Sequence, residues 1–436
     1  MSPTTAELHV YLNKEPIGTL YRIGNGGDVG LAYDSAYRDN AASTPLSLSL
    51  PLARTNHQPP TVAAFLWGLL PDNKVAVDAL ATQARTSAGD IFGLIRHVGR
   101  DVAGAAQFLP PDTTEDSEGA GLIELTPSEL AARIADLRNA AQNNLPTSYD
   151  NGRWSLAGAQ AKIALRYENG HWFIPEGREP STHIVKPAVP GFEDFDVQEA
   201  AILTAAGVIG LRAAPTTVIE LEDGTHGLVS VRYDRARAAD GTWTRIHQED
   251  LCQALGYAPA FKYETEGGPG IDAISRLLTT LPGPDSYEAR SRFFDALVLS
   301  WAIGATDGHA KNYSLVLSGG AAALAPLYDI NSAIPYTRPW GKRYANMRKL
   351  HSALRIGTET AFTRIKAEHW QTVARQLRLK PGTAIEQVER ISREIGPALA
   401  QAYAELADKA GVPADQRTDW PTVLADYRTT LQSPNP

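Results

Sequence analysis

Three oxygen-bearing side chains in the second half of the chain have the types and spacing that phosphoryl transfer requires. Asp307 and Asn312 stand five residues apart in the segment DGHAKN, and Asp329 follows after a predicted hairpin. In phosphoryl transfer an aspartate accepts the proton of the attacking hydroxyl group, while an asparagine and a second aspartate hold magnesium. We therefore predict that Asp307 is the catalytic base and that Asn312 and Asp329 are metal ligands, with ATP and Mg²⁺ as cofactors. The alternative is an ordinary turn at Asp307 with Asn312 as a cap.

Two further residues would hold the nucleotide phosphates. Lys186 ends the apolar strand HIVK, from where its ammonium group would reach the α- and β-phosphates. Glu199, on the following predicted helix, is the natural partner that would hold this lysine. A lysine at a strand end is usually a solvated edge residue, so this prediction depends on the aspartates described above. The segment SLAGAQAK, residues 155–162, has small side chains that let backbone N–H groups approach phosphate, although an ordinary tight turn fits it equally well.

The elements expected around these residues form two lobes. Strands are predicted at 163–167, 172–174, 183–186, 216–221 and 227–231, with a helix at 196–206. From Ile246 onward the pattern is mostly helical, and a helix at 292–305 would support the catalytic segment from behind. The stretch 228–233 would join the lobes and offer backbone groups to adenine, or serve as a plain linker. A small strand-rich lobe before a large helical lobe is the arrangement of protein kinases.

A further β-containing unit precedes these lobes. The alternating segment LSLSLPL at 46–52 predicts a half-buried strand. Thr126 and Pro127 predict the start of a helix after the polar stretch 110–121. Other elements are predicted as helices at 61–70, 73–88 and 91–97 and as a strand at 101–109. The predicted fold class is α+β, a two-lobed protein-kinase-like fold. Its domains are an N-terminal subdomain at 1–115, a strand-rich N-lobe at 116–235 and an all-helical C-lobe at 236–436.

Composition favours a cytoplasmic location. The chain of 436 residues has a formal charge of −8 and a single cysteine, Cys252, which allows no internal disulfide and suits a reducing compartment. The first residues lack the basic and apolar regions of a secretory signal. The most apolar helical stretch, 293–305, is too short to cross a bilayer, so we expect no membrane association.

One region departs from the acidic average. Residues 338–380 contain eleven Lys or Arg residues against two glutamates. Such a run usually forms a solvated face of a helix. Arg375 and Arg378 stand three apart on a predicted helix at 370–379, so both would project from one side and could contact a DNA backbone.

Taken together, these motifs resemble those of the HipA-type serine/threonine kinases, the toxins of bacterial toxin–antitoxin pairs. The resemblance extends over essentially the whole chain, and the combination of SLAGAQAK with TDGHAKN is highly specific. The motifs that carry it are PLSLSLPL (45–52), LLPD (69–72), GRDVAGA (99–105), SLAGAQAK (155–162), THIVK (182–186), VRYDR (231–235), HQEDLCQALG (247–256), KYETEGGPGI (262–271), GATDGHAKN (304–312) and PLYDI (326–330).

The resemblance implies roles for individual residues. Ser155 is expected to be an autophosphorylation site, whose phosphorylation would expel the small-residue loop and switch the kinase off. Val231 stands where an acidic hinge residue would be expected, so any contact with nucleotide there would come from the backbone. The implied ATP-binding residues are Ala157, Gly158, Ala159, Gln160, Ala161, Lys162, Lys186, Val231, Arg232, Tyr233, His309, Ala310, Lys311, Asn312, Tyr328 and Asp329.

The resemblance also implies partners. The function would be that of a serine/threonine protein kinase toxin acting on a protein, with glutamate–tRNA ligase, an aminoacyl-tRNA synthetase, as the model substrate. Phosphorylation would stall translation and favour dormancy. A helix-turn-helix antitoxin (HipB-like) would neutralise the toxin, and the pair would bind operator DNA, with Arg375 and Arg378 as contacts. The alternatives are a small-molecule or lipid kinase of the same fold and a non-catalytic corepressor that binds antitoxin and DNA.

Overall fold

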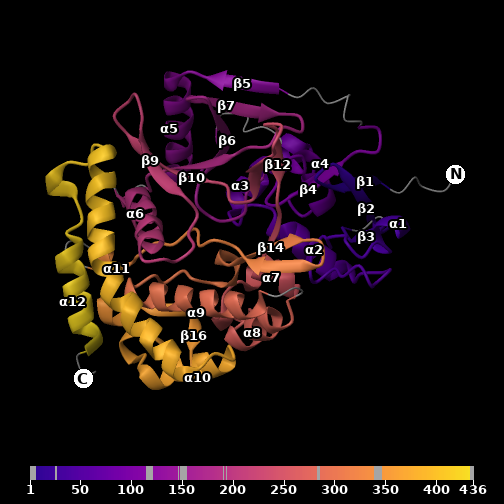
Figure 1. The fold of residues 1–436 in the computed structure, drawn as a ribbon. Helices are drawn as coiled ribbons and strands as arrows, with labels where there is room; N and C mark the ends of the chain where they lie inside the picture. The colour runs from indigo at the N-terminus through magenta and orange to yellow at the C-terminus, as the bar shows by residue number, and fades with distance from the viewer. Residues whose placement is uncertain are drawn as a thin grey trace.

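The computed structural model describes residues 6–24, 27–113, 121–145, 147, 155–189, 191–192, 194–281, 285–337 and 346–432. Three parts follow one another along the chain: an N-terminal subdomain, a small strand-rich lobe and a large lobe that is mainly helical (Figure 1). In the described parts of the chain, no helix combines the length and apolar character needed to cross a membrane.

The N-terminal subdomain is an antiparallel sheet covered by helices. Its strands run in the order β3-β2-β1-β4. Alternate residues such as Leu8 and Val10 are fully buried and form a core with the helices. The elements are β1 (Glu7–Leu12), β2 (Glu15–Arg22), β3 (Val29–Tyr33), α1 (Ser35–Arg38), α2 (Pro59–Gly68), α3 (Lys74–Ala84), α4 (Ile91–Val98) and β4 (Ala106–Leu109).

The strand predicted at 46–52 is wrong. A turn with one isolated bridge between Ser47 and Leu50 stands there instead. Leu46 and Leu50 are buried, as the alternation suggested, but the chain turns because a buried glutamate side chain from the large lobe accepts hydrogen bonds from it. The Ser47 hydroxyl and the Leu48 N–H donate to Glu249 at 2.5 and 2.9 Å. The strand predicted at 101–109 is likewise shorter, since only β4 pairs regularly with β1.

The small lobe is a six-stranded antiparallel sheet with one helix on each face. The strand order is β5-β7-β6-β8-β10-β9. Its strands are β5 (Gly121–Leu125), β6 (Ile163–Glu168), β7 (His171–Glu176), β8 (His183–Pro187), β9 (Thr216–Glu220) and β10 (His226–Val231). Helix α5 (Pro127–Asn143) begins with the predicted Thr126 cap, completed as a capping box by Glu129. Helix α6 (Phe195–Val208) lies on the other face.

The two faces of this sheet pack against different hydrophobic cores. Val185 joins the core under α5, together with Val229 of β10. Leu228 of β10 instead joins the large core that includes α6. Because side chains alternate along a strand, Lys186 points to the α6 side, away from α5. The sheet therefore presents the lysine toward the large lobe.

The large lobe is mainly helical, as predicted, but not all-helical. Helix α9 (Ser286–Ala302) crosses its core, where Phe293, Phe294 and Val298 are buried. A small sheet in the order β13-β14-β15 holds the catalytic segment. The other elements are β11 (Arg235–Arg237), β12 (Trp243–Arg245), β13 (His247–Asp250), α7 (Leu251–Leu255), α8 (Ile271–Thr279), β14 (Ser314–Ser318), β15 (Ala321–Leu324), β16 (His351–Ile356), β17 (Glu359–Ala361), α10 (Ala367–Gln376), α11 (Pro381–Lys409) and α12 (Trp420–Gln432).

Candidate active site

The segment after α9 forms a closed loop that presents Asp307. Gly304 makes the turn at φ +63°, and a side chain there would collide with Ile334 at 2.4 Å. The N–H of His309 and the side-chain amide of Asn312 both donate to the Asp307 carbonyl, at 2.8 and 2.7 Å. The spacing of five residues thus folds Asn312 back onto the peptide of Asp307. The Asp307 side chain remains 68% exposed.

One oxygen of the Asp307 carboxylate is held by a residue from a distant segment. The Tyr263 hydroxyl donates to Asp307 Oδ1 at 2.6 Å, and His309 Nε2 lies 4.0 Å from the same oxygen. The Tyr263 and His309 rings pack edge to face at 4.9 Å. Burial and the neighbouring Asp307 both raise the pKa of Tyr263, so its hydroxyl keeps the proton that it donates. Within the described residues Oδ2 has no hydrogen-bond partner, so this oxygen remains available as an acceptor.

Lys186 joins the two lobes through two carboxylates. Its Nζ lies 2.7 Å from Glu199 Oε1 on α6 and 2.7 Å from Asp329 Oδ1 in the large lobe. Lys186 and Glu199 are almost completely buried, whereas the Asp329 side chain is 33% exposed. Burial disfavours the charge on Lys186, but the two carboxylates outweigh it and raise its pKa. Burial raises the pKa of Glu199. Burial also opposes the charge of Asp329, but the nearby charges of Lys186 and Lys162 outweigh it and keep the pKa of Asp329 below its ordinary value.

The backbone at Asp329 has a conformation that suits this contact. Its φ is +56°, a left-handed value that is uncommon for residues other than glycine. The preceding Tyr328 is fixed by its hydroxyl, which donates to the Lys311 carbonyl at 2.8 Å and shares a hydrogen bond with Ser314 at 2.6 Å. Hydrogen-bonded neighbours therefore hold Asp329 in a locally unfavourable geometry that directs its carboxylate to Lys186, a pattern typical of functional sites.

The small-residue loop lies close to the group formed by Lys186, Glu199 and Asp329, which we call the Lys186 cluster. Lys162 donates to the Ala157 carbonyl at 2.7 Å across Gly158, whose φ is +105°. Burial lowers the pKa of Lys162 to about 8, although the Asp329 charge opposes this shift. Ala159, which is exposed, and the half-buried Gln160 and Ala161 complete the loop. The loop therefore brings a second cation near Asp329.

Ser155, at the start of this loop, is buried. Its side chain is only 2% exposed, and its hydroxyl donates to the Leu69 carbonyl of the N-terminal subdomain at 2.8 Å. Its N–H donates to the Asp101 carbonyl at 3.0 Å. In this conformation Ser155 cannot receive a phosphoryl group, so modification requires the start of the loop to move.

The predicted hinge residues are not equivalent. The Arg232 side chain is 3% exposed and points into a buried cluster, where it donates to Asp234 at 2.8 Å and lies 3.5 Å from Asp101. The Arg232 side chain is therefore engaged in this cluster and is not free to line a nucleotide, which the sequence had led us to expect of it. Tyr233 packs on Tyr328 with ring centroids 5.7 Å apart, and Val231 is exposed.

Three residues of this site, Asp72, Lys262 and Tyr263, were assigned no role from the sequence. Asp72 accepts hydrogen bonds from both Lys262 and Lys311, and Tyr263 holds Asp307. They lie in the motifs LLPD and KYETEGGPGI, which contribute to the family resemblance but to which we assigned no chemical role. An aspartate directly after an apolar run was the available signal, but its partners lie 190 and 239 residues away.

The predicted DNA contacts are only partly on a helix. Helix α10 ends at Gln376, and Arg378 follows in a left-handed conformation with φ +53°. The prediction that Arg375 and Arg378 share one face of a helix is therefore wrong, although both residues are exposed. The chain leaves the helix because Leu379 N–H bonds back to the Ala374 carbonyl in a helix-ending turn. Residues 338–345 of the basic stretch lie outside the described residues.

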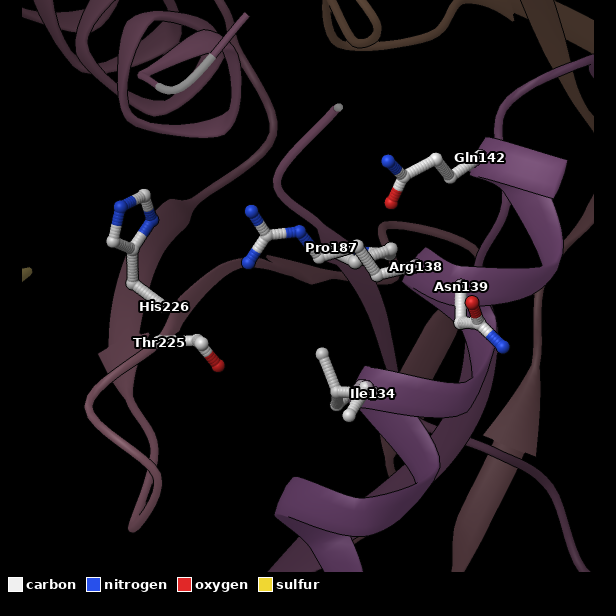
Figure 2. Close-up of a pocket in the computed structure, with 8 residues that line it drawn as sticks. Ile134, Arg138, Asn139, Gln142, Pro187, Thr225 and His226 are labelled. Carbon is white, nitrogen blue, oxygen red and sulfur yellow. The ribbon is translucent and has the colours of Figure 1, made fainter. Parts of the chain in front are cut away.

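A cavity of about 120 Å³ lies away from these groups. Arg138 of α5 points toward His226 of β10 across Pro187 (Figure 2). Pro187 follows Lys186 in β8, so the two side chains point to opposite faces of the sheet. This cavity therefore belongs to the α5 side and is not where Lys186 would meet a nucleotide.

Comparison with known proteins shows which family the chain belongs to. The model of the HipA N-terminal domain matches residues 8–109, and that of the HipA-like C-terminal domain matches residues 154–401. The chain therefore belongs to the HipA family. It is 33% identical over 384 residues to a putative kinase, Y4mE, of Sinorhizobium fredii, covering 88% of this chain and 87% of that one.

Two comparisons cover nearly the whole chain. The serine/threonine-protein kinase toxin HipA of Shewanella oneidensis is 28% identical, over 98% of this chain and 94% of its own. The solved structure of a HipA, HipB and operator DNA complex from Shewanella oneidensis superposes with a TM-score of 0.80 at 26% identity, covering 97% of this chain and 95% of the other. These likenesses confirm the predicted family and fold class.

Proposed function

We propose that this protein is an ATP-dependent serine/threonine protein kinase that acts as the toxin of a toxin–antitoxin pair. The observation that carries the proposal is the convergence of Lys186, Glu199 and Asp329 beside the loop that presents Asp307. The neighbour of Asp329, Tyr328, bonds the Lys311 carbonyl in that loop, and the charge of His309 in the loop acts on Asp329. Its relatives are named as kinases, one of them as a serine/threonine kinase toxin. An intact set of these groups is not expected in a non-catalytic corepressor.

The donor set fits Mg²⁺ bound together with ATP. Asn312 uses its side-chain nitrogen for Asp307, so its side-chain oxygen is left for a metal, and Asp329 has a second oxygen beyond the one at Lys186. Magnesium takes one or two protein oxygens and fills its shell with phosphate and water, and when bound it would neutralise phosphate charge. No cluster of three or more His, Cys, Asp or Glu ligands occurs among the described residues, in keeping with such a shared site.

The protein residues would then divide the work of transfer. Lys186 and Lys162 offer positive charge to the phosphates, while Glu199 keeps Lys186 in place. The free oxygen of Asp307 accepts the proton of the attacking serine or threonine hydroxyl, with Tyr263 fixing the carboxylate. Most of the rate acceleration in phosphoryl transfer comes from such positioning and charge stabilisation.

Control and partners follow from the same proposal. Phosphorylation of Ser155 would prevent its return to the buried position against Leu69, so the loop would stay out and the kinase would be off. The related HipA was solved with HipB and operator DNA. We accordingly expect a helix-turn-helix antitoxin and operator DNA as partners, a protein substrate such as an aminoacyl-tRNA synthetase, and a cytoplasmic location.

The test is phosphoryl transfer by the purified full-length chain with labelled ATP and Mg²⁺. The wild type is expected to label itself at Ser155. Asp307→Asn should lower the rate at least about 100-fold, because a general base contributes that much or more. Asp408→Asn is the matched control, since Asp408 is an exposed aspartate paired with Arg417 on the surface, and should transfer at the wild-type rate.

The outcomes separate the alternatives. A wild type that labels neither itself nor any protein in a cell lysate, but phosphorylates a small molecule, would support the small-molecule or lipid kinase. No transfer to any acceptor, with operator binding intact, would support the corepressor. Phosphoproteomics after brief induction, beside the Asp307→Asn variant, would identify the protein substrate.

A further inference from the structure

One carboxylate of the N-terminal subdomain reaches into the large lobe. Asp72 follows α2 in the motif LLPD, and its side chain is 12% exposed. Its Oδ1 accepts a hydrogen bond from Lys311 at 2.5 Å, and its Oδ2 accepts one from Lys262 at 2.8 Å. Two lysines that are far apart in the sequence therefore converge on this single acidic group.

Both lysines belong to the segments that frame the predicted base. Lys311 lies in the turn Ala310–Asn312, directly before the asparagine that closes the loop around Asp307. Lys262 precedes Tyr263, whose hydroxyl holds Asp307. The two segments also touch directly, since the Ala310 N–H donates to the Lys262 carbonyl at 3.3 Å. Asp72 thus ties together the two stretches of chain that determine where Asp307 points.

The backbone around Asp72 is anchored on its other side. The Asp72 N–H donates to the Gly158 carbonyl at 3.2 Å, Pro71 forms a bridge with Gly158, and the Leu69 carbonyl accepts from Ser155. Short contacts on both sides leave little freedom to the carboxylate. An anchor of this kind can hold its partners within the narrow tolerance that transfer demands.

Electrostatics makes the contact strong. Burial disfavours the charge of Asp72, but the two lysines outweigh burial and keep its pKa below the ordinary value. Lys311 is only 4% exposed, so it depends on a nearby anion. Asp250, which caps α7 through Gln253, is a second acidic group whose charge interacts with that of Lys311. Loss of the Asp72 charge would leave the buried Lys311 ammonium group without the anion that it contacts directly, which is costly for a buried ion pair.

We infer that Asp72 is a positioning residue for phosphoryl transfer, through which the N-terminal subdomain holds the catalytic segment in its working geometry. The inference rests on the proposed kinase function and deepens it, because it makes transfer depend on a part of the chain outside the two lobes. Asp72 bonds to Lys311 and Lys262, and it is through these two lysines that it would act.

The test compares two Asp→Asn variants of the full-length protein. Asp72→Asn removes the buried charge. Asp78→Asn is the matched control in the same subdomain, since Asp78 accepts from Lys74 at 2.6 Å on the exposed face of α3. The rate of self-phosphorylation is measured as a function of Mg²⁺–ATP concentration. We expect Asp72→Asn to lower the maximal rate about 10- to 100-fold, with the half-saturating ATP concentration changed less than about threefold. Asp78→Asn should match the wild type, and Asp72→Glu should recover part of the rate.

A second readout is independent of activity. Amide hydrogen exchange of the peptide containing residues 306–313 is measured without nucleotide, because His309, Ala310 and Asn312 have hydrogen-bonded N–H groups there. Asp72→Asn should speed exchange in this peptide at least about tenfold while Asp78→Asn leaves it unchanged. If Asp72→Asn does not fold, Lys262→Met, which removes one of the two lysine contacts, takes its place with a smaller expected effect in the same direction.

The results separate this inference from the proposed function. A wild type without any transfer would overturn the kinase, and the exchange experiment would still decide whether Asp72 holds the loop. Wild-type transfer rate and exchange in Asp72→Asn would overturn the positioning role. So would hydrogen exchange at the wild-type rate in an Asp72→Asn variant that has lost activity, because the loop would then be held as firmly as before.

Discussion

Two clusters of buried charge in this molecule are built on opposite principles. The first lies where the N-terminal subdomain meets the lobes and contains Arg232, Arg235, Arg245, Asp101 and Asp234. All five side chains are at most 9% exposed, and their closest ion pairs measure 2.7 to 3.2 Å. Backbone carbonyls accept the remaining guanidinium N–H groups, for example that of Val102. We call this group the arginine cluster.

The second is the Lys186 cluster, formed by Lys186, Glu199 and Asp329. Here one cation serves two carboxylates, one member is 33% exposed, and one backbone angle is left-handed. The arginine cluster is closed and satisfied, which suits a joint. The Lys186 cluster keeps one carboxylate exposed to solvent, which suits a site that receives a charged ligand. Burial of charge alone therefore does not identify a functional site.

The largest expected effect comes from breaking the joint. Asp101→Asn preserves shape but leaves three guanidinium groups with one carboxylate. Because removal of one partner from a buried ion pair is strongly destabilising, we expect a loss of about 3 to 5 kcal/mol in the free energy of unfolding, measured by urea denaturation. The exposed Asp112→Asn is the control and should leave the transition unchanged. Equal stability of both variants would contradict the structural role of the cluster.

In contrast to Asp101→Asn, Lys186→Met should mainly reduce activity and should have a smaller effect on stability. Loss of the cation should lower phosphoryl transfer at least about 100-fold, a typical cost of removing one group that stabilises transferred charge. Its stability should fall less than that of Asp101→Asn, because Asp329 faces water and Glu199 can take a proton. Lys409→Met, which removes an exposed lysine bonded to Thr217, is the control. A larger loss of stability in Lys186→Met than in Asp101→Asn would refute the distinction.

The smallest expected effect is on the pH dependence of stability, and it concerns Glu249, a buried acid that is not paired with a cation in the part of the chain that the structure describes. Burial raises the pKa of Glu249 from its ordinary 4.5 to about 8, although hydrogen bonds from Ser47 and Leu48 oppose the shift. Between these values the folded protein keeps a proton that the unfolded chain releases, so stability falls as pH rises from 4.5 to about 8. Glu249→Gln should flatten this dependence by about 1 kcal/mol per pH unit, measured as unfolding free energies at pH 6, 7 and 8. Parallel curves for the two proteins would show that Glu249 does not carry the dependence.

Local pattern was sufficient where neighbours in the sequence decide the structure. The Thr126 cap places the start of α5 because the capping groups stand within one turn. The five-residue spacing of Asp307 and Asn312 allows Asn312 to close the loop on the Asp307 carbonyl. The same reasoning failed at Ser47, where apolar alternation predicted a strand and Glu249, 202 residues away, imposed a turn. It failed again at Arg378, which lies past the end of α10.

The sequence by itself determined the types and local spacing of the groups that would perform the chemistry, because these depend on covalent neighbours and short turns. Tertiary structure alone decided which charges meet. It directed Arg232 into a closed joint, placed Asp329 against Lys186, and brought Asp72 and Tyr263 to the segment of Asp307. Contacts between residues so distant in the chain follow from how three separate cores pack together, and no local pattern records that packing.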